Sequence, residues 1–458
     1  MISLDLLVYA LTAVIVLIIV MAIVYRHLHS IELCLAIMFV LIGIFNLSII
    51  PGGMVLRNYT FLLFFPFLLP YIIDYFRPEK LIVKSASSFR FDRILISIYL
   101  IFFILSVVVV NIKDLLTPGG IAKIGVFVGG VIFFCHYFPK ANLKNPKIWK
   151  FLLKFTAIVG IVTGIVGIIF YFGGVNVNPS AIGASSSYFK HPNSCAFIYS
   201  ISVPIILYPL LFERSEMRKD EFLLILISLF IVYFAMIITL SRAGYIAIFI
   251  STMILVFLKS KKAFIFSLAA TFLIGYFFLQ SFLLAKGSAS SLSRLGLIYS
   301  AIEMLKSSNI GFLLGFGTIS VFDKFTEFKF QLGPLLEDVA YPHNAILFYI
   351  MQFGILTLIP LLAYSILLIV KAIRIIRKDK EMNKDLIIPF TVTISLFFQS
   401  MLEDTVLFPE FYVFYLYMAF FGYLTYRVIG THANNEEINS GNSYKGTIIL
   451  GNQNSKGN

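Results

Sequence analysis

The chain has 458 residues and a net charge of +13, with 59% hydrophobic and only 13% charged residues. Together with a mean hydropathy of +0.94, this composition excludes an ordinary soluble globular protein. In a membrane protein, basic residues collect in cytoplasmic loops, which accounts for the positive charge without a nucleic-acid partner.

Apolar runs recur along the whole chain at a length of about 20 residues, which spans the hydrocarbon core of a bilayer. The alternating ten-residue segments of a transmembrane β-barrel are missing from the sequence. We therefore predict an all-α, polytopic transmembrane helical bundle of about 12–13 spans. The candidate spans are 4–25, 31–50, 58–76, 94–112, 120–138, 151–172, 193–212, 222–240, 243–258, 263–285, 344–370, 386–402 and 408–428.

The connections between these spans divide the chain into three regions. Residues 1–190 are expected to form N-terminal transmembrane helices, and residues 191–430 a second membrane region that contains a long loop at 286–343. The tail 431–458 is rich in Asn, Ser and Gly, has little to bury, and is predicted to be disordered.

Lys/Arg-rich and Lys/Arg-poor connections alternate along the chain, which predicts the orientation in the membrane. Because basic connections remain in the cytoplasm, loop 286–343 is expected outside it and the C-terminus inside. An odd number of spans would also place the N-terminus outside.

The long loop is predicted to contain an amphipathic helix at 291–306 that lies along the membrane interface. Its apolar side chains at helical spacing are Leu292, Leu295, Ile298 or Tyr299, Ile302 and Leu305, and its other face carries Arg294, Glu303 and Lys306. Arg294 is either a solvated or lipid-facing charge or part of a site. Gly311, Gly315 and Gly317 then permit a tight turn or close backbone approach.

Two further connections on the same side carry candidate polar residues. In the first, Asn193 or Ser194 caps the following helix, or His191 and Asn193 contact a substrate. In the second, Ser241 and Arg242 lie between two closely spaced spans. An arginine there either snorkels to lipid headgroups or binds an anionic ligand.

The loop ends at His343 and Asn344, immediately before a span. A histidine in this position is either a capping or interfacial hydrogen bonder, or a base that takes a proton from a hydroxyl group near pH 7. Glu403 and Asp404 precede the last span on the same side. Their carboxylates are expected to pair with one of the arginines or to be hydrated.

From about residue 191 to 408 the chain resembles the O-antigen ligase and O-antigen polymerase (Wzy-like) superfamily of bacterial membrane glycosyltransferases. The ligases of this family carry a motif of His, then Asn, Ser or Gln, nine residues, Gly, two residues, and then Gly, Thr or Tyr. The residues His343, Asn344, Gly354 and Thr357 are similar to this motif at every defined position. Other matching segments are His191-Pro192-Asn193, Ser241-Arg242-Ala243-Gly244, and Arg294 followed by Gly315-Phe316-Gly317.

The resemblance implies a bacterial inner-membrane enzyme with its active site on the extracytoplasmic face. It would transfer a glycan from a polyprenyl diphosphate to a glycan or lipid-glycan acceptor, among membrane lipids and with a chain-length regulator as a further partner. His343, Arg294 and Arg242 would be catalytic, and the substrate-binding residues would be Asn344, His191, Asn193, Ser241, Glu403 and Asp404. No cofactor or metal is expected, and transfer would proceed by single displacement with inversion.

Three functions remain open from the sequence. A polymerase would add the glycan to another repeat unit of surface polysaccharide, such as O-antigen or capsule. A ligase would move the glycan to lipid A-core or another acceptor. A flippase or transporter of lipid-linked oligosaccharide is the alternative from another class, although transporters usually bind substrate near the membrane midplane.

Overall fold

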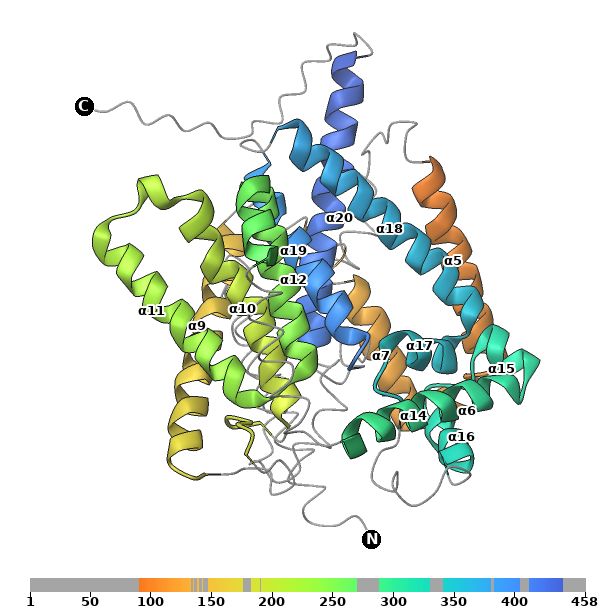
Figure 1. The fold of residues 1–458 in the computed structure, drawn as a ribbon. Coiled ribbons are helices and arrows are strands. Elements are labelled where there is room, and N and C mark those ends of the chain that lie inside the picture. Colours follow the sequence, from red (N-terminus) through yellow and green to blue (C-terminus); the bar gives the residue numbers. More distant parts are fainter. Residues whose placement is uncertain are drawn as a thin grey trace, which may run out of the picture.

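The computed structural model describes residues 90–132, 135, 138–139, 142, 147–175, 183–189, 191–269, 288–329, 341–379, 383–403 and 412–439. All regular elements in these ranges are helices, which confirms the predicted all-α class (Figure 1). The candidate spans 4–25, 31–50 and 58–76, and most of 263–285, lie outside the described residues.

The helices follow the predicted spans closely. They are α5 (Arg90–Val109), α6 (Ile112–Leu115), α7 (Pro118–Ile132), α9 (Lys147–Phe172), α10 (Pro192–Phe212), α11 (Lys219–Thr239), α12 (Arg242–Lys259), α14 (Ser288–Lys306), α15 (Asn309–Leu314), α16 (Ser320–Lys329), α17 (Ala345–Phe353), α18 (Ile355–Lys378), α19 (Ile387–Ser400) and α20 (Tyr412–Asn439). Among the described residues, α9, α10, α11, α12 and α18 are long and apolar enough to cross a membrane. These helices support a multi-pass membrane protein.

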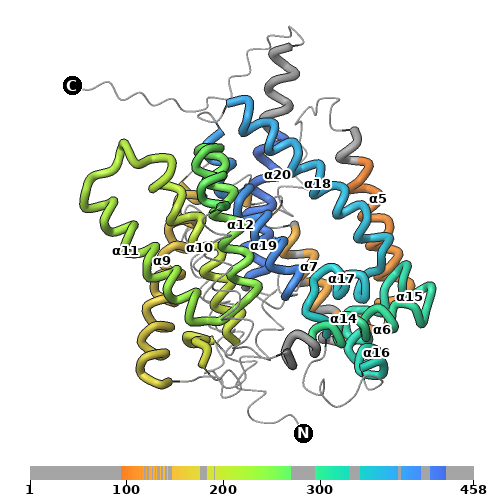
Figure 2. The backbone as a smooth tube through the Cα atoms, in the orientation of Figure 1, coloured from red at the N-terminus to blue at the C-terminus, as the bar shows by residue number. Residues whose placement is uncertain are grey.

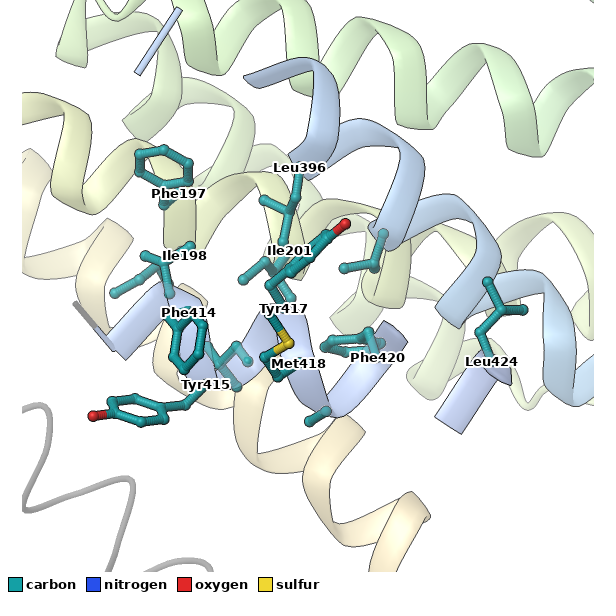
Figure 3. Close-up of a cluster of buried hydrophobic side chains, with 14 of the residues drawn as sticks. Phe197, Ile198, Ile201, Leu396, Phe414, Tyr415, Tyr417, Met418, Phe420 and Leu424 are labelled. Atoms are coloured by element: carbon teal, nitrogen blue, oxygen red, sulfur yellow. The ribbon is translucent and has the colours of Figure 1, made fainter. Parts of the chain in front are cut away.

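Helix α10 forms the centre of the bundle and packs against α9, α11, α12 and α19. In an apolar stretch of 18 residues of α10, 78% of the residues are buried within the protein, compared with 28–33% in the other four long helices. Side chains of α10 and α19 meet those of α20 in a buried cluster that includes Phe197, Ile201, Leu396, Phe414 and Phe420 (Figure 3). The partly exposed surfaces of the outer helices are apolar, as expected for helices that face lipid.

The two ends of the bundle differ in charge. Helices α11 and α12 join at the end drawn lowest in Figure 1, where α10 begins and α19 ends and where α14, α15 and α16 gather; we call this the lower end (Figures 1 and 2). The basic residues that begin α9 and α11 and end α12 and α18 lie at the opposite end: Lys147, Lys219, Lys259, Arg377 and Lys378. The long loop and the Lys/Arg-rich connections are therefore at opposite ends.

The predicted continuous span 344–370 is wrong, because α17 and α18 are separate helices that meet at Gly354. Gly354 has a φ of +83°, which favours glycine. A Cβ atom there would lie 2.1 Å from the carbonyl oxygen of Leu313, and one at Gly315 would lie 2.2 Å from that of Gln352. The amide of Phe316 also donates to the Met351 carbonyl at 2.7 Å. This close backbone approach of the long loop interrupts the helix.

The loop helix predicted at 291–306 is present as part of α14, and the side that packs against the protein is not the side that carries most of the predicted apolar residues. Leu297, Ala301, Met304 and Leu305 are buried against the protein. Leu295, Tyr299 and Ile302, which were assigned to the same apolar face as Leu305, are 63%, 52% and 38% exposed. The packed face therefore also includes Arg294, one turn before Leu297, because residues three and four apart share a helix face.

At the C-terminus, α20 extends to Asn439, past residue 431 at which the predicted tail begins. Residues 440–458 lie outside the described residues.

Candidate functional site

The carboxylate of Glu403 is the centre of a polar cluster at the lower end of the bundle. Glu403 follows the end of α19, where its amide donates to the Gln399 carbonyl at 3.1 Å, and it is only 3% exposed. A buried carboxylate is costly unless it is paired and hydrogen-bonded. Its partners come from three other segments of the chain: Asn193 in α10, Arg294 in α14 and His343 before α17.

Arg294 binds one side of this carboxylate. Its Nη2 lies 2.7 Å from Glu403 Oε1, and its Nη1 donates to the Leu402 carbonyl at 3.3 Å. The Arg294 side chain is 30% exposed, so the guanidinium is partly open to the surroundings. The sequence left open whether Arg294 is solvated or belongs to a site, and in the structure it is an ion-pair partner of a buried acid.

His343 contacts the other carboxylate oxygen. Its Nδ1 lies 3.2 Å from Glu403 Oε2, and its side chain is 20% exposed. When Nδ1 carries the proton and faces a carboxylate, the neutral imidazole has its acceptor lone pair on Nε2. In this arrangement Nε2 can act as a base and accept a proton on the side of the ring that faces away from Glu403.

Asn344 connects the segment that carries His343 to the segment that carries Glu403, and it forms two hydrogen bonds. Its Oδ1 accepts from the Leu347 amide at 3.0 Å and caps α17, whereas its Nδ2 donates to the Met401 carbonyl at 2.8 Å. Asn344 is adjacent to His343, and Met401 is two residues before Glu403. The side chain predicted to bind substrate is therefore engaged with the protein itself.

The start of α10 contributes His191 and Asn193. The Asn193 side-chain amide donates to Glu403 Oε1. The α10 cap is His191, not Asn193 or Ser194 as expected: its Nδ1 accepts from the Asn193 amide at 3.2 Å, and Pro192 occupies the first turn, where proline is favoured. His191 is also near enough to Glu403 to interact with it electrostatically.

Ser241 and Arg242 begin α12 beside this cluster. The Ser241 hydroxyl is buried and accepts from the Gly244 amide at 3.3 Å, so it serves as the helix cap. Arg242, the first helical residue, is partly buried, is attracted by Glu403 and is repelled by Arg294. Arg294 and His343, which lie far apart in the sequence, thus contact one carboxylate, and Arg242 is near enough to interact with it electrostatically.

The electrostatic environment keeps Glu403 ionised. Burial alone would raise its pKa, but the contact with His343 and the charges of His343, Arg294 and His191 outweigh burial and hold the pKa below its ordinary value of 4.5. Carboxyl groups with a pKa shifted by burial and by specific charged partners are concentrated at functional sites.

Two polar residues that the sequence alone did not identify, Asn111 and Asp114, bind the long loop through hydrogen bonds. Asp114 accepts from the Ile319 amide at 2.7 Å and from the Ser320 hydroxyl at 2.6 Å, and the Asn111 side chain accepts from the Thr318 amide at 2.7 Å. Their only signal in the sequence is their position at the end of the apolar run 94–112 and directly after it. They attach the segment that follows Gly317 to α6 and to the turn between α5 and α6.

Asp404 lies outside the described residues. Within the ranges that the structure covers, no group of three or more His, Cys, Asp and Glu side chains could hold a metal ion.

Comparison with known families then identifies the region that carries most of this geometry. Residues 226–362 match the family model described as O-antigen ligase. This segment is similar to the O-antigen ligase family. The O-antigen ligase segment extends from α11 into α18 and contains Arg242, Arg294 and His343. The family supports glycosyltransferase activity of the O-antigen ligase and polymerase type. No curated protein matches the chain.

The matched segment ends before α19, so Glu403 lies outside it, as does Asn193 on the other flank. The O-antigen ligase segment thus supplies both arginines and the histidine, and the neighbouring parts of the chain supply the carboxylate that they share.

Proposed function

We propose that this protein is a membrane glycosyltransferase that moves a glycan from a polyprenyl diphosphate to a sugar hydroxyl, as a polymerase of surface polysaccharide such as O-antigen or capsule. The observation that carries the proposal is the buried Glu403 carboxylate between Arg294 and His343. The site would face outside the cytoplasm, where nucleotide sugars are absent and a lipid-linked donor is required.

In this proposal, Arg242 and Arg294 stabilise the leaving diphosphate. Guanidinium groups stay charged and can bind phosphate oxygens through two parallel hydrogen bonds. Because Arg242 and Arg294 repel each other, an anion bound between them lowers the energy of both. Charge that develops on the leaving group in the transition state would be stabilised most strongly in such a prearranged site.

His343 would act as the base. The acceptor hydroxyl oxygen attacks the anomeric carbon while the bond between that carbon and the phosphate oxygen breaks, and its electron pair leaves with the lipid diphosphate. His343 Nε2 takes the hydroxyl proton, and Glu403 stabilises the imidazolium that forms. A single displacement of this kind inverts the anomeric configuration. We propose that it needs no metal because the two guanidinium groups supply the positive charge.

Ligation of the finished glycan to lipid A-core or another acceptor is the second candidate. It is favoured by the similarity of residues 226–362 to the family described as O-antigen ligase. Both candidates use the same donor and the same proton transfer, so they differ only in the acceptor that approaches His343.

The test is transfer by purified, membrane-reconstituted protein supplied with lipid-linked glycan. His343→Ala and Arg294→Ala are expected to lower turnover by about 10²–10⁴-fold, the range for loss of a general base or a transition-state charge contact. Arg218→Ala is the matched control, because Arg218 is 72% exposed and pairs with Asp220 and Glu221 at the opposite end of the bundle.

Product analysis decides the acceptor. A ladder of repeat lengths supports the polymerase, and attachment of one glycan to a different acceptor supports the ligase. Wild-type turnover in both site variants would refute the assignment of His343 and Arg294 to the site. Translocation of the donor without any new glycosidic bond would refute glycan transfer and favour a transporter.

A further inference from the structure

Helix α15 presents three large apolar side chains outward at the lower end of the bundle. Ile310, Phe312 and Leu313 are 63%, 42% and 41% exposed. They lie in the stretch 307–322, which contains no Asp, Glu, Lys or Arg. An uncharged segment with exposed apolar side chains is more compatible with lipid than with water.

The backbone of α15 forms hydrogen bonds at both ends of the helix, which fix the position of these side chains. The Ser308 hydroxyl accepts from the Gly311 amide at 3.0 Å, and the Gly315 amide donates to the Gly311 carbonyl at 2.9 Å. On the inner side Gly311 is buried, and a Cβ atom there would lie 2.2 Å from the Phe316 ring. Gly311 therefore faces the protein, whereas Ile310, Phe312 and Leu313 are exposed.

This face continues the apolar surface of α5. The Ser106 hydroxyl in α5 donates to the Leu314 carbonyl at 2.6 Å, which joins the two helices. Around Ser106, α5 exposes Leu105, Val108 and Val109 by 41%, 55% and 51%. Residues 94–109 of α5 form an apolar helix that is shorter than the five candidate membrane spans. Beyond its end, Lys113 is exposed, as a side chain at headgroup level would be.

We propose that α15 lies at the boundary between headgroups and acyl chains, with Ile310, Phe312 and Leu313 inserted among the lipids of the leaflet at the lower end. The bilayer would then support the contact between Gly315 and the end of α17, and through α17 the position of His343. This proposal concerns lipid contact and is independent of the reaction that the site performs.

The chain contains one tryptophan, Trp149, which is 6% exposed and stacks on Tyr423 at 3.9 Å. Phe312→Trp in a Trp149→Phe background therefore gives a single reporter on α15. The full chain is reconstituted in phosphatidylcholine vesicles with or without bromine on the upper part of the acyl chains. The control reporter is Lys324→Trp in the same background, on the polar helix α16, where Lys324 is 40% exposed and pairs with Glu327.

We expect brominated lipid to quench the Trp at 312 at least twofold more than the Trp at 324, and aqueous iodide to quench the Trp at 324 more strongly. Quenching of the Trp at 312 by iodide and not by brominated lipid would overturn the proposal, because α15 would then face water. Protection from both quenchers would also overturn it, since another segment or a second copy of the chain would cover α15.

If the Trp149→Phe protein does not fold, the reporter is Leu313→Trp in a chain that keeps Trp149. The fluorescence of Trp149, measured in the unsubstituted protein, is then subtracted from that of the variant. The same two outcomes then apply.

Discussion

His343 Nδ1 lies 3.2 Å from Glu403 Oε2. In the sequence, the two residues are separated by helices α17, α18 and α19. Because Glu403 is buried and also binds Arg294, the imidazole and the guanidinium share one support. Movement of Glu403 would displace both groups that the proposed reaction needs.

Glu403→Gln tests this shared support. The amide has nearly the same shape but carries no charge, so it neither stabilises an imidazolium nor balances Arg294. We expect turnover to fall by about 10²-fold, at the low end of the contribution of general acid–base catalysis, with a smaller change in KM. Glu303→Gln is the matched control, because Glu303 lies on α14 and forms an ion pair with Lys306, one turn away on the same helix. Equal turnover in the two variants would contradict the assigned role.

The lowered pKa of Glu403 predicts a specific pH dependence of stability. A carboxyl whose pKa is lower in the folded state stabilises the fold fully above its ordinary pKa, and this stabilisation is lost as pH falls toward the folded value. We therefore expect the wild type to keep a higher thermal unfolding midpoint than Glu403→Gln, measured in detergent, from pH 7 down to about 4.5, and the difference to shrink at lower pH. A difference that disappears by about pH 6 would mean that the pKa is raised, not lowered.

Asn344 can be dissected by two substitutions because its two hydrogen bonds use different atoms. Asn344→Asp keeps an oxygen that caps α17 but loses the donor to the Met401 carbonyl, whereas Asn344→Ala loses both. We expect Asn344→Asp to lower turnover while thermal stability stays close to wild type. Asn344→Ala should also lose about 1 kcal/mol of stability through the missing cap. Wild-type turnover in Asn344→Asp would show that the bond to Met401 does not position His343.

Gly354→Ala tests the backbone contact that separates α17 from α18. A Cβ atom at 354 would meet the Leu313 carbonyl, which cannot move away as a flexible side chain could, and φ of +83° is itself unfavourable for alanine. Gly174→Ala is the control: φ is +66° there, but nothing lies within 4 Å of the added atom. The control should cost only the strain of about 1–2 kcal/mol for a left-handed residue, and Gly354→Ala clearly more. Similar losses of stability in the two variants would argue against the contact.

Local chemistry in the sequence was sufficient for the fold class and for several elements of the site. Runs of apolar residues predict membrane helices because every backbone group must be paired within the bilayer. Ser241, Asn344 and Pro192 occur at helix starts for reasons of capping and backbone geometry that act within a few residues. The motif around His343 and the arginines at Lys/Arg-poor connections likewise identified candidates before any contact was known.

Tertiary packing decided what these candidates do. The faces of α14 could not be assigned by periodicity because apolar residues occur on both sides, and only the contacts of Leu297 and Met304 show which side packs. The break at Gly354 depends on Leu313 in another segment, and the pairing of Glu403 with Arg294 and His343 joins three separate parts of the chain. The sequence alone determined a helical membrane protein with a set of polar residues near one face. Whether each polar side chain is hydrated, caps a helix or forms an ion pair depends on contacts between residues far apart in the sequence. The energies of these contacts cannot be read from a local sequence pattern.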